Sequence, residues 1–365
     1  MTTAGGWSRA AVYLLLLVAL LLLSACADGA EDDAVYSSAA DSGPTSSATV
    51  TPAAAVTMAP AALLPDPAAS LPKSLGWAYM LQNDVAVEIA VTDFDVIVMD
   101  YTKDGTDDPT QRYTAAEMDA LKGEGATRVA LAYLSIGEAE DFRYYFDPRW
   151  TDEQERGRPD QDAPSWLSKA NPEWEGNYRV KYWSEAWQQI ILGCVDKLIA
   201  YGFDGAYLDI VDGFEYWGDQ GNGEGYSLSE AEAAGRMIDF VKAIAAHARA
   251  EDGGFVVIPQ NGERILDYDA TGDYLKVIDG IGIEDLYYNE RTAIERAETD
   301  QRTRYLDEVL EAGKPVIVVD YVYAGSRDAV VDDFLTRATA AGYFPYAART
   351  DRELDELVTF AGQGE

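Results

Sequence analysis

Two carboxylates in the segment 201–217, YGFDGAYLDIVDGFEYW, have the residue type and spacing for chemistry. Asp209 interrupts an otherwise apolar run, and Asp212 follows it by three residues. A carboxylate in an apolar strand is costly unless hydrogen bonds or water satisfy it, which favours a wet strand end. Tyr216 and Trp217 follow at once. Acids that act on a glycosidic bond, beside flat rings that stack on sugar faces, indicate carbohydrate chemistry. The alternative is that each Asp only caps the turn after a strand.

The elements that must position these groups alternate along the chain. Helix signals include a capping box at Thr114–Glu117, Ser184 before a helix that ends at Gly202, and Ser227–Glu230 before another. Eight strands alternating with helices predict one (β/α)8 TIM barrel, with a doubly wound open sheet as the alternative. No Gly-rich dinucleotide fingerprint follows the first strand, which weakens that alternative. The eight apolar runs are Leu75–Gln82, Phe94–Thr102, Arg128–Gly137, Gly205–Asp212, Phe255–Asn261, Gly280–Tyr288, Pro315–Val322 and Tyr343–Ala347.

The carboxyl ends of the eight predicted strands carry polar and aromatic residues. Active sites of such barrels lie at these ends, so together they predict a carbohydrate cleft. The alternative is that strand ends are polar because the chain turns there. Tyr216 and Trp217 belong to the same predicted cleft. In strand order, the residues are Trp77, Tyr79, Gln82, Asp100, Tyr101, Ser135, Glu138, Asp209, Asp212, Gln260, Asn261, Glu284, Asp285, Asp320, Tyr321 and Tyr346.

A long aromatic-rich loop is expected after the third strand, over residues 138–183. Long loops in compact domains are commonly lids or binding loops, although the rings could form a satellite core over the barrel instead. The aromatic residues are Phe142, Tyr144, Tyr145, Phe146, Trp150, Trp166, Trp174, Tyr178, Tyr182 and Trp183.

Composition limits the classes of partner. The 365 residues have a formal net charge of -36, so nucleic acid is excluded as a partner, because phosphate contacts need Lys and Arg. An acidic surface suits a cationic ligand or a salty habitat. His247 is the only histidine, which argues against a Ser-His-Asp triad and a His-rich metal site. We expect no metal and no cofactor.

The N-terminal residues predict a lipoprotein. Arg9 precedes an apolar run that ends in Leu23-Ser-Ala-Cys26, which resembles the bacterial lipobox. We expect residues 1–26 to be the signal peptide, with lipid on Cys26, and 27–72 to be a disordered Ala/Ser/Thr/Pro tether. Residues 73–365 would form one domain, outside the cytoplasm, held to the membrane by the lipid alone. An ordinary signal peptide or a transmembrane anchor is the alternative. We expect Cys194 to be buried and the protein to be a monomer.

Three segments in order resemble one family: AYLSIGEAEDFRYY (132–145), EGNYRVKYW (175–183) and GFDGAYLDIVDGFEYW (202–217). They are similar to the bacterial and archaeal extracellular branch of the glycoside hydrolase 114-type family, which is named for endo-α-1,4-polygalactosaminidase and has a (β/α)8 barrel. The resemblance implies that Asp209 ends strand four and Glu284 ends strand six as the catalytic pair. The polygalactosaminidase branch typically has Asn after the strand-four Asp, where this chain has Ile210.

These observations predict a secreted glycoside hydrolase of polysaccharides. Asp209 would be the nucleophile and Glu284 the general acid/base of a retaining mechanism. Parity places Gly282 and Glu284 inside the barrel and Ile281 and Ile283 toward the helices. The family implies an α-linked galactosamine polymer, and the acidic strand ends, which include no Lys or Arg, fit a cationic substrate. A non-catalytic carbohydrate-binding surface protein and a metal-dependent deacetylase are the rival hypotheses.

Overall fold

The computed structural model describes residues 75–83, 89–106, 108–151 and 159–360. All of them belong to the unit Pro60–Glu365 into which the chain divides. The expected signal peptide (1–26), its Cys26 and the tether (27–72) lie outside the described residues, so these expectations remain predictions. None of the helices in the described part is long and apolar enough to cross a membrane.

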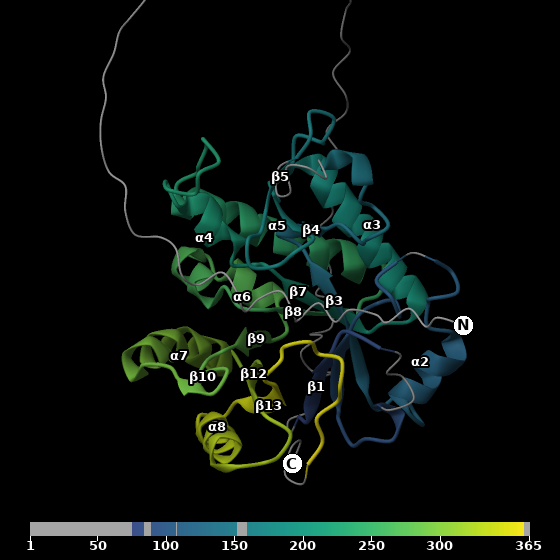
Figure 1. Ribbon diagram of the computed structural model, residues 1–365, viewed down its shortest axis with the longest axis vertical. Coiled ribbons are helices and arrows are strands. Elements are labelled where there is room, and N and C mark those ends of the chain that lie inside the picture. Colours follow the sequence, from purple (N-terminus) through teal and green to yellow (C-terminus); the bar gives the residue numbers. More distant parts are fainter. Residues whose placement is uncertain (1–74, 84–88, 107, 152–158, 361–365) are drawn as a thin grey trace, which may run out of the picture. The chain divides into compact units, whose positions relative to one another are not determined.

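Eight parallel strands follow one another around a barrel, in the order of the sequence (Figure 1). The first five are hydrogen-bonded as one sheet and the last three as another, and an isolated parallel bridge from Gln260 to Gly282 joins the two. The first and last of these strands are neighbours, and the Trp77 Nε1 donates to the Phe344 carbonyl at 2.8 Å between them. The (β/α)8 prediction is confirmed, and each predicted run overlaps one barrel strand, although the last two strands extend one and two residues past the predicted ends. They are β1 (Trp77–Met80), β2 (Val96–Met99), β3 (Val129–Ser135), β7 (Gly205–Asp209), β8 (Val256–Pro259), β9 (Ile281–Glu284), β12 (Val316–Tyr323) and β13 (Phe344–Arg349).

Aromatic side chains fill the interior of the barrel. The Trp77 and Tyr346 ring centres lie 5.7 Å apart, and the Tyr79 and Tyr207 ring centres lie 5.5 Å apart in an edge-to-face arrangement. Gly282 makes room for this layer, because a Cβ at that position would lie 1.9 Å from the Tyr207 hydroxyl. Parallel strands are covered on both faces, which explains why they read as nearly continuous apolar runs.

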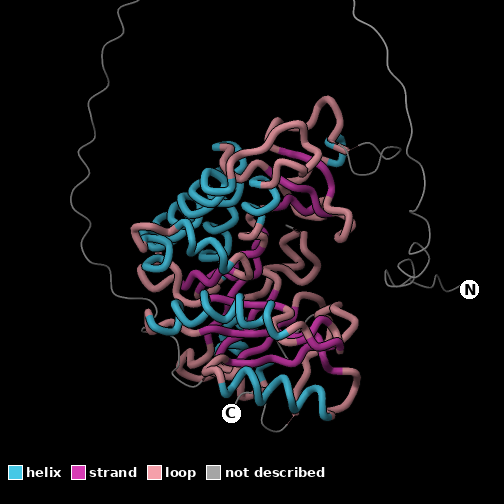
Figure 2. Tube along the Cα trace, turned by 90° about the vertical axis from the view of Figure 1, so that its left-hand side faces the viewer, coloured by secondary structure: helices cyan, strands magenta, loops and turns pink. Residues whose placement is uncertain are grey.

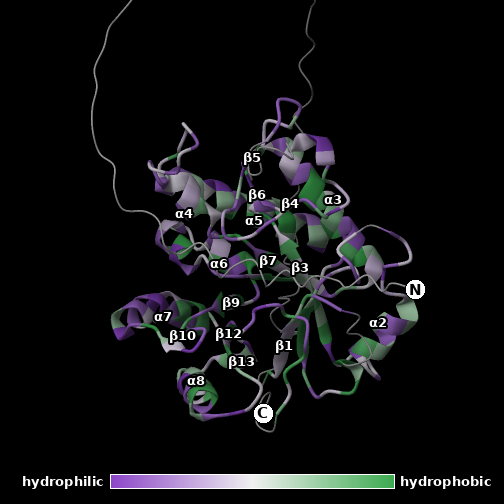
Figure 3. Ribbon diagram, viewed as in Figure 1, coloured by the Kyte–Doolittle hydropathy of each residue, from purple (hydrophilic) through white to green (hydrophobic). Residues whose placement is uncertain are grey.

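Helices flank the strands on the outside, as Figure 2 shows. The α7 helix presents a narrow apolar stripe that includes Leu306 and Val309, and its other faces are hydrophilic (Figure 3). The helices are α2 (Ala115–Lys122), α3 (Glu185–Tyr201), α4 (Gly213–Gly218), α5 (Glu230–Glu251), α6 (Asp273–Val277), α7 (Arg296–Glu311) and α8 (Ala329–Ala340), with 3-10 turns at η3 (Pro148–Trp150) and η4 (Glu263–Tyr268).

The predicted helix ends are mostly confirmed. Thr114 and Glu117 form the capping box of α2, with the Glu117 N–H donating to Thr114 Oγ1 at 3.2 Å. Gly202 ends α3 in the left-handed conformation with φ 88°. Two details differ from the prediction. Ser184 precedes α3 without a side-chain cap hydrogen bond, and Ser229, two residues after the predicted Ser227, caps α5.

The expected long segment 138–183 follows β3 and also contains a small sheet that was not predicted from the sequence. Its strands pair antiparallel in the order β4-β6-β5. Several of its aromatic rings are buried, which supports the satellite-core alternative, whereas Phe142, Tyr144 and Trp174 are exposed. A short hairpin, β10 (Tyr288–Asn289) and β11 (Thr292–Ala293), follows β9. The strands of the small sheet are β4 (Glu138–Glu140), β5 (Leu167–Ala170) and β6 (Asn177–Val180), and the buried rings are Phe146, Trp166, Tyr178 and Tyr182.

Candidate active site

Asp209 ends β7 at the carboxyl rim of the barrel, where the sequence places it. Its Oδ1 accepts a hydrogen bond from the Ile210 N–H at 2.7 Å, and its Oδ2 accepts one from the Tyr133 hydroxyl at 2.6 Å. The second distance is typical of an O–H···O⁻ bond to a charged acceptor. Both partners are fixed by strands or by the turn, so the carboxylate has one orientation.

Ile210 is held in an unusual backbone conformation to donate that bond. Its φ is 58°, in the left-handed region that β-branched residues rarely adopt. A Cβ on Gly137 would lie 2.3 Å from the Ile210 carbonyl oxygen, so only glycine fits there. Asn261 and Asp285, which follow β8 and β9, also have positive φ. Strain of this kind is concentrated at functional sites.

Glu284 ends β9 and receives three side-chain donors. Its Oε2 accepts from the Asn261 amide at 3.0 Å and from the Gln260 amide, and its Oε1 accepts from the Tyr321 hydroxyl. The Glu284 N–H donates in turn to Asn261 Oδ1 at 3.0 Å. The Tyr79 hydroxyl donates to Gln260 Oε1 at 3.0 Å and so orients that amide. The structure therefore holds Glu284 as firmly as Asp209.

The two carboxylates influence each other's ionisation. Burial raises the pKa of Asp209 well above its usual range, and the charge of Glu284 raises it further. Burial also raises the pKa of Glu284, which the Tyr321 and Asn261 donors partly oppose. Two acids that share a desolvated site favour a state with one proton between them.

The hydrogen bonds allow either carboxyl to carry that proton. In each, N–H groups donate to one oxygen, whereas the other oxygen faces a phenol, Tyr133 for Asp209 and Tyr321 for Glu284. An N–H can only donate, but a phenol can donate to a carboxylate or accept from a carboxylic acid. Either carboxyl can therefore gain or lose a proton on the oxygen that faces the phenol without losing its hydrogen bond to that phenol.

Arginines neutralise several of the predicted rim carboxylates, which corrects the expectation of an uncompensated acidic rim. Arg143 and Arg179 come from the inserted sheet and its flanks, and Arg352 from beyond β13, so a survey of strand ends misses all three. Arg143 also bonds Glu140 at 2.8 Å and lies 4.5 Å from the Tyr101 ring centre. The ion pairs are Asp100 with Arg143 at 2.9 Å, Glu138 with Arg179 at 3.5 Å, and Asp285 with Arg352 at 2.6 Å.

Asp212 differs from these paired carboxylates. It is half-buried at the start of α4, and within the described part of the chain its side chain has no hydrogen bond and no ion pair. Burial, together with the charges of Glu215 and Glu138, raises its pKa to about 7. Asp212 is therefore an acceptor without a partner in the described part of the chain, near Asp209 and Glu284.

Asp320 does not line a cleft, contrary to the prediction. It is fully buried, and its two oxygens accept from the backbone N–H groups of residues 286, 287 and 288 at 2.8–3.0 Å. It fixes the turn that follows Glu284. Gln82 is also used structurally, since its amide donates to the Glu353 carbonyl at 2.8 Å.

Several predicted aromatic contacts are also packing residues. Their rings are at most 1% exposed, which leaves no face for a sugar, so the prediction is wrong for them. Tyr79 and Tyr321 instead support Glu284, through Gln260 and directly, and Asn261 does so through its amide. Tyr216 is half-buried, with the Arg179 guanidinium 3.9 Å from its ring centre. The buried rings are Trp77, Tyr101, Trp217 and Tyr346.

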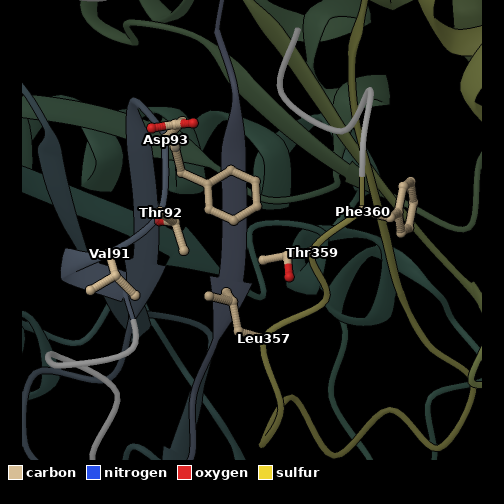
Figure 4. A pocket seen from close by; sticks show the side chains of 7 residues that line it. Val91, Thr92, Asp93, Leu357, Thr359 and Phe360 are labelled. Atoms are coloured by element: carbon tan, nitrogen blue, oxygen red, sulfur yellow. The ribbon is translucent and has the colours of Figure 1, made fainter.

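A cavity of about 570 Å³ lies elsewhere, between the segment that enters β2 and residues 357–360 (Figure 4). Its size would suit a small ligand. Asp93 is the only titratable residue in its lining, which also includes Phe94 and Phe360. It offers no pair of carboxylates, so the chemistry assigns the site to Asp209 and Glu284.

The family model of glycoside-hydrolase family GH114 matches residues 57–364. The chain belongs to this family. An uncharacterised protein of Methanocaldococcus jannaschii is 43% identical over 289 residues, which is 78% of each chain. Two solved GH114-like folds are also similar. The glycoside hydrolase domain of PelA from Pseudomonas aeruginosa matches with TM-score 0.54 and 16% identity, over 77% of this chain and 96% of that one. Ega3 of Aspergillus fumigatus, in complex with galactosamine, matches with TM-score 0.52 and 18% identity, over 78% and 94%.

Membership of GH114 supports a glycoside hydrolase, as the sequence predicted. The resemblance in fold to PelA and Ega3 extends over most of the barrel, but at these identities it concerns the fold alone.

Proposed function

We propose that this GH114 protein hydrolyses an α-linked galactosamine polymer by a retaining mechanism, with Asp209 as nucleophile and Glu284 as general acid/base. The observation that carries the proposal is the half-buried pair of carboxylates at the ends of β7 and β9, with one strand between them. Each carboxyl has a phenol on one oxygen and N–H donors on the other. Two such carboxyls are what glycoside hydrolysis requires.

In the first step, an Asp209 oxygen attacks the anomeric carbon while Glu284 gives its proton to the departing glycosidic oxygen. This forms a glycosyl ester on Asp209 and releases the leaving-group sugar. In the second step, Glu284 takes a proton from water as the water oxygen attacks the anomeric carbon, and Asp209 leaves as a carboxylate. Tyr321 can donate to Glu284 when it is charged and accept from it when it is protonated, so it supports both steps.

The substrate class follows from the carboxylate at the strand ends that no arginine neutralises. Arginines neutralise Asp100, Glu138 and Asp285, whereas Asp212 has no partner in the described part of the chain. We assign Asp212 to the amine of the sugar, because an ammonium group would supply the missing hydrogen bonds and charge. The family resemblance and the galactosamine in the Ega3 complex favour galactosamine over other amino sugars.

We place the protein outside the cytoplasm, with a lipid on Cys26 as its membrane attachment and a polysaccharide as its partner. The Leu23-Ser-Ala-Cys26 sequence after an apolar run supports this placement. We propose that it acts as a monomer and does not bind nucleic acid, consistent with the net charge of -36.

The test is digestion of an α-1,4-galactosamine polymer and of its fully N-acetylated form, with products identified by mass spectrometry. The wild type should release oligosaccharides from the free-amine polymer, and Asp209→Asn and Glu284→Gln should not. Asp239→Asn, an exposed residue on α5, is the matched control and should be fully active. Binding without cleavage would instead indicate the carbohydrate-binding alternative. Acetate release that a chelator abolishes would indicate a deacetylase.

A further inference from the structure

The chain continues past β13 as a strap, residues 350–358, that lies across the carboxyl end of β1. The Leu81 and Gln82 N–H groups both donate to the Leu354 carbonyl, at 2.8 and 3.1 Å. The Gln82 side chain adds its bond to the Glu353 carbonyl. Figure 1 shows this yellow segment beside β1. The strap is therefore anchored to the barrel close to the candidate active site.

Arg352 projects from the strap in a constrained geometry. Its φ is 60°, and that of Leu354 is 50°, so two non-glycine residues of the strap adopt the left-handed conformation. The Arg352 guanidinium donates to both Asp285 oxygens, at 2.7 and 2.6 Å. Asp285 follows Glu284 directly and also has a positive φ. Strained backbone on both sides of an ion pair indicates that the surrounding contacts specify this arrangement.

The same guanidinium lies against the phenol that bonds Glu284. The Arg352 Cζ is 4.2 Å from the Tyr321 ring centre, and the Tyr321 hydroxyl donates to Glu284 Oε1. A cation over the face of a ring is attracted to it and polarises it. Electron withdrawal from a phenol strengthens its O–H as a donor, in the way that linked hydrogen bonds polarise one another.

We propose that Arg352 is a positioning residue that holds the Tyr321 phenol against Glu284 and favours the charged form of that carboxylate. In the reaction proposed above, on which this role rests, the charged form is the one that activates water in the second step. Within the described part of the chain, Arg352 has no hydrogen bond to the Glu284 side chain, and it acts through Tyr321 and Asp285.

Other groups around Glu284 act on the same ionisation. Arg302 contributes a second guanidinium, but it bonds the carbonyl oxygens of Glu284 and Asp285 and the Glu263 carboxylate rather than the Glu284 side chain. The positive charge of Arg302 is therefore largely balanced by the Glu263 carboxylate. The remaining titratable and charged groups facing Glu284 are Asp209 and Tyr207 from β7, Asp212 from α4, Asp285, Tyr79 from β1, and Tyr321 from β12.

The experiment is a carboxyl NMR titration of protein carrying 13C-labelled glutamate, with the Glu284 signal assigned by its loss in Glu284→Gln. Arg352→Met keeps the aliphatic stem and removes the charge, so the Glu284 midpoint should rise by about one pH unit. Asp285→Asn removes a negative charge next to Glu284 and should lower the Glu284 midpoint. Arg352→Lys keeps a charge without the planar fork and should lie between the wild type and Arg352→Met.

Arg349→Met is the matched control. Arg349 pairs with Asp351 and Glu356 on the same segment and has no ring contact with Tyr321, so its loss should leave the Glu284 midpoint unchanged. Opposite displacements in Arg352→Met and Asp285→Asn support the proposal. No displacement, or displacement in one direction in both, overturns it. If Arg352→Met fails to fold, the Arg352→Lys and Asp285→Asn pair decides.

The titration needs no substrate, so it separates this proposal from the proposed function. If the wild type has no glycosidase activity, the proposed hydrolytic function is contradicted. If the Glu284 midpoint nevertheless moves in opposite directions in Arg352→Met and Asp285→Asn, the control of Glu284 by Arg352 still stands. In an active enzyme, the basic limb of kcat/KM against pH should move in parallel with the NMR midpoint, since that limb reports the acid of the free enzyme.

Discussion

Removing the Tyr133 hydroxyl should move the acidic limb of the pH–rate profile and leave the basic limb unchanged. In Tyr133→Phe the ring and its packing remain, but Asp209 Oδ2 loses the donor that lies 2.6 Å away. The bond stabilises the charged form of Asp209, so its loss must raise the pKa of that carboxyl. Only the Ile210 N–H then remains to hold it.

The size of the effect follows from the kind of bond. A hydrogen bond to a charged group contributes about 1.5–3 kcal/mol, and one pKa unit corresponds to about 1.4 kcal/mol. The acidic limb of kcat/KM against pH, which reports the ionised nucleophile, should therefore move upward by about 1–2 pH units. The basic limb should stay where it is. The assay is the initial rate of reducing-end release from the galactosamine polymer over a range of pH.

Two further variants make this result decisive. Tyr321→Phe removes a donor to Glu284 and should move the basic limb upward instead. Tyr274→Phe removes a buried hydroxyl that has no hydrogen-bond partner in the described structure, and it should move neither limb. A basic limb that moves in Tyr133→Phe would mean that the two carboxylates have exchanged roles, and two unmoved limbs would refute the reasoning.

Three other outcomes are expected, two from the structure and one from the sequence. Asp209→Asn and Glu284→Gln should each raise Tm at pH 7 by several degrees, or about 1–2 kcal/mol, because they remove one charge from a half-buried pair of acids. Since the folded pKa values are raised, the wild type loses stability as pH rises from the ordinary carboxyl range, so calorimetry should find the gain absent near pH 4. Asp320→Asn should lower Tm by several degrees, because an amide cannot accept from all three backbone N–H groups, at a cost of about 1–3 kcal/mol; an unchanged Tm would contradict its role. Cys26→Ser should release the protein from the membrane fraction, and a mature N-terminus without lipid in the wild type would end that proposal.

The barrel and the positions of its two candidate catalytic carboxylates can be predicted from the sequence, because both depend on local pattern. Strands buried on both faces leave apolar runs, and Asp209 and Glu284 stand out as carboxylates at the ends of such runs. The small sheet also left a signal that was missed. Residues 177–180, NYRV, alternate between polar and apolar side chains, which is the period of a strand, and the structure buries the two apolar ones.

The partners of the rim residues could not be predicted, because they are distant in sequence. Asp100 and Arg143 are separated by 43 residues, and Asp285 and Arg352 by 67. A buried carboxylate requires a partner, but nothing local says which arginine supplies it. The same limit applies to Asp320. A carboxylate at the end of a strand can bind a ligand or accept hydrogen bonds from a nearby turn, and the sequence does not distinguish these two roles.

The most direct test of the central claim is mass spectrometry of Glu284→Gln quenched during turnover of an activated α-galactosaminide. A good leaving group needs no proton, whereas the second step still lacks its base, so the glycosyl-enzyme should accumulate. The account predicts one added sugar on the peptide that contains Asp209, and none in the Asp209→Asn, Glu284→Gln double variant. A sugar on Asp212, or release of the inverted anomer without any adduct, would contradict it.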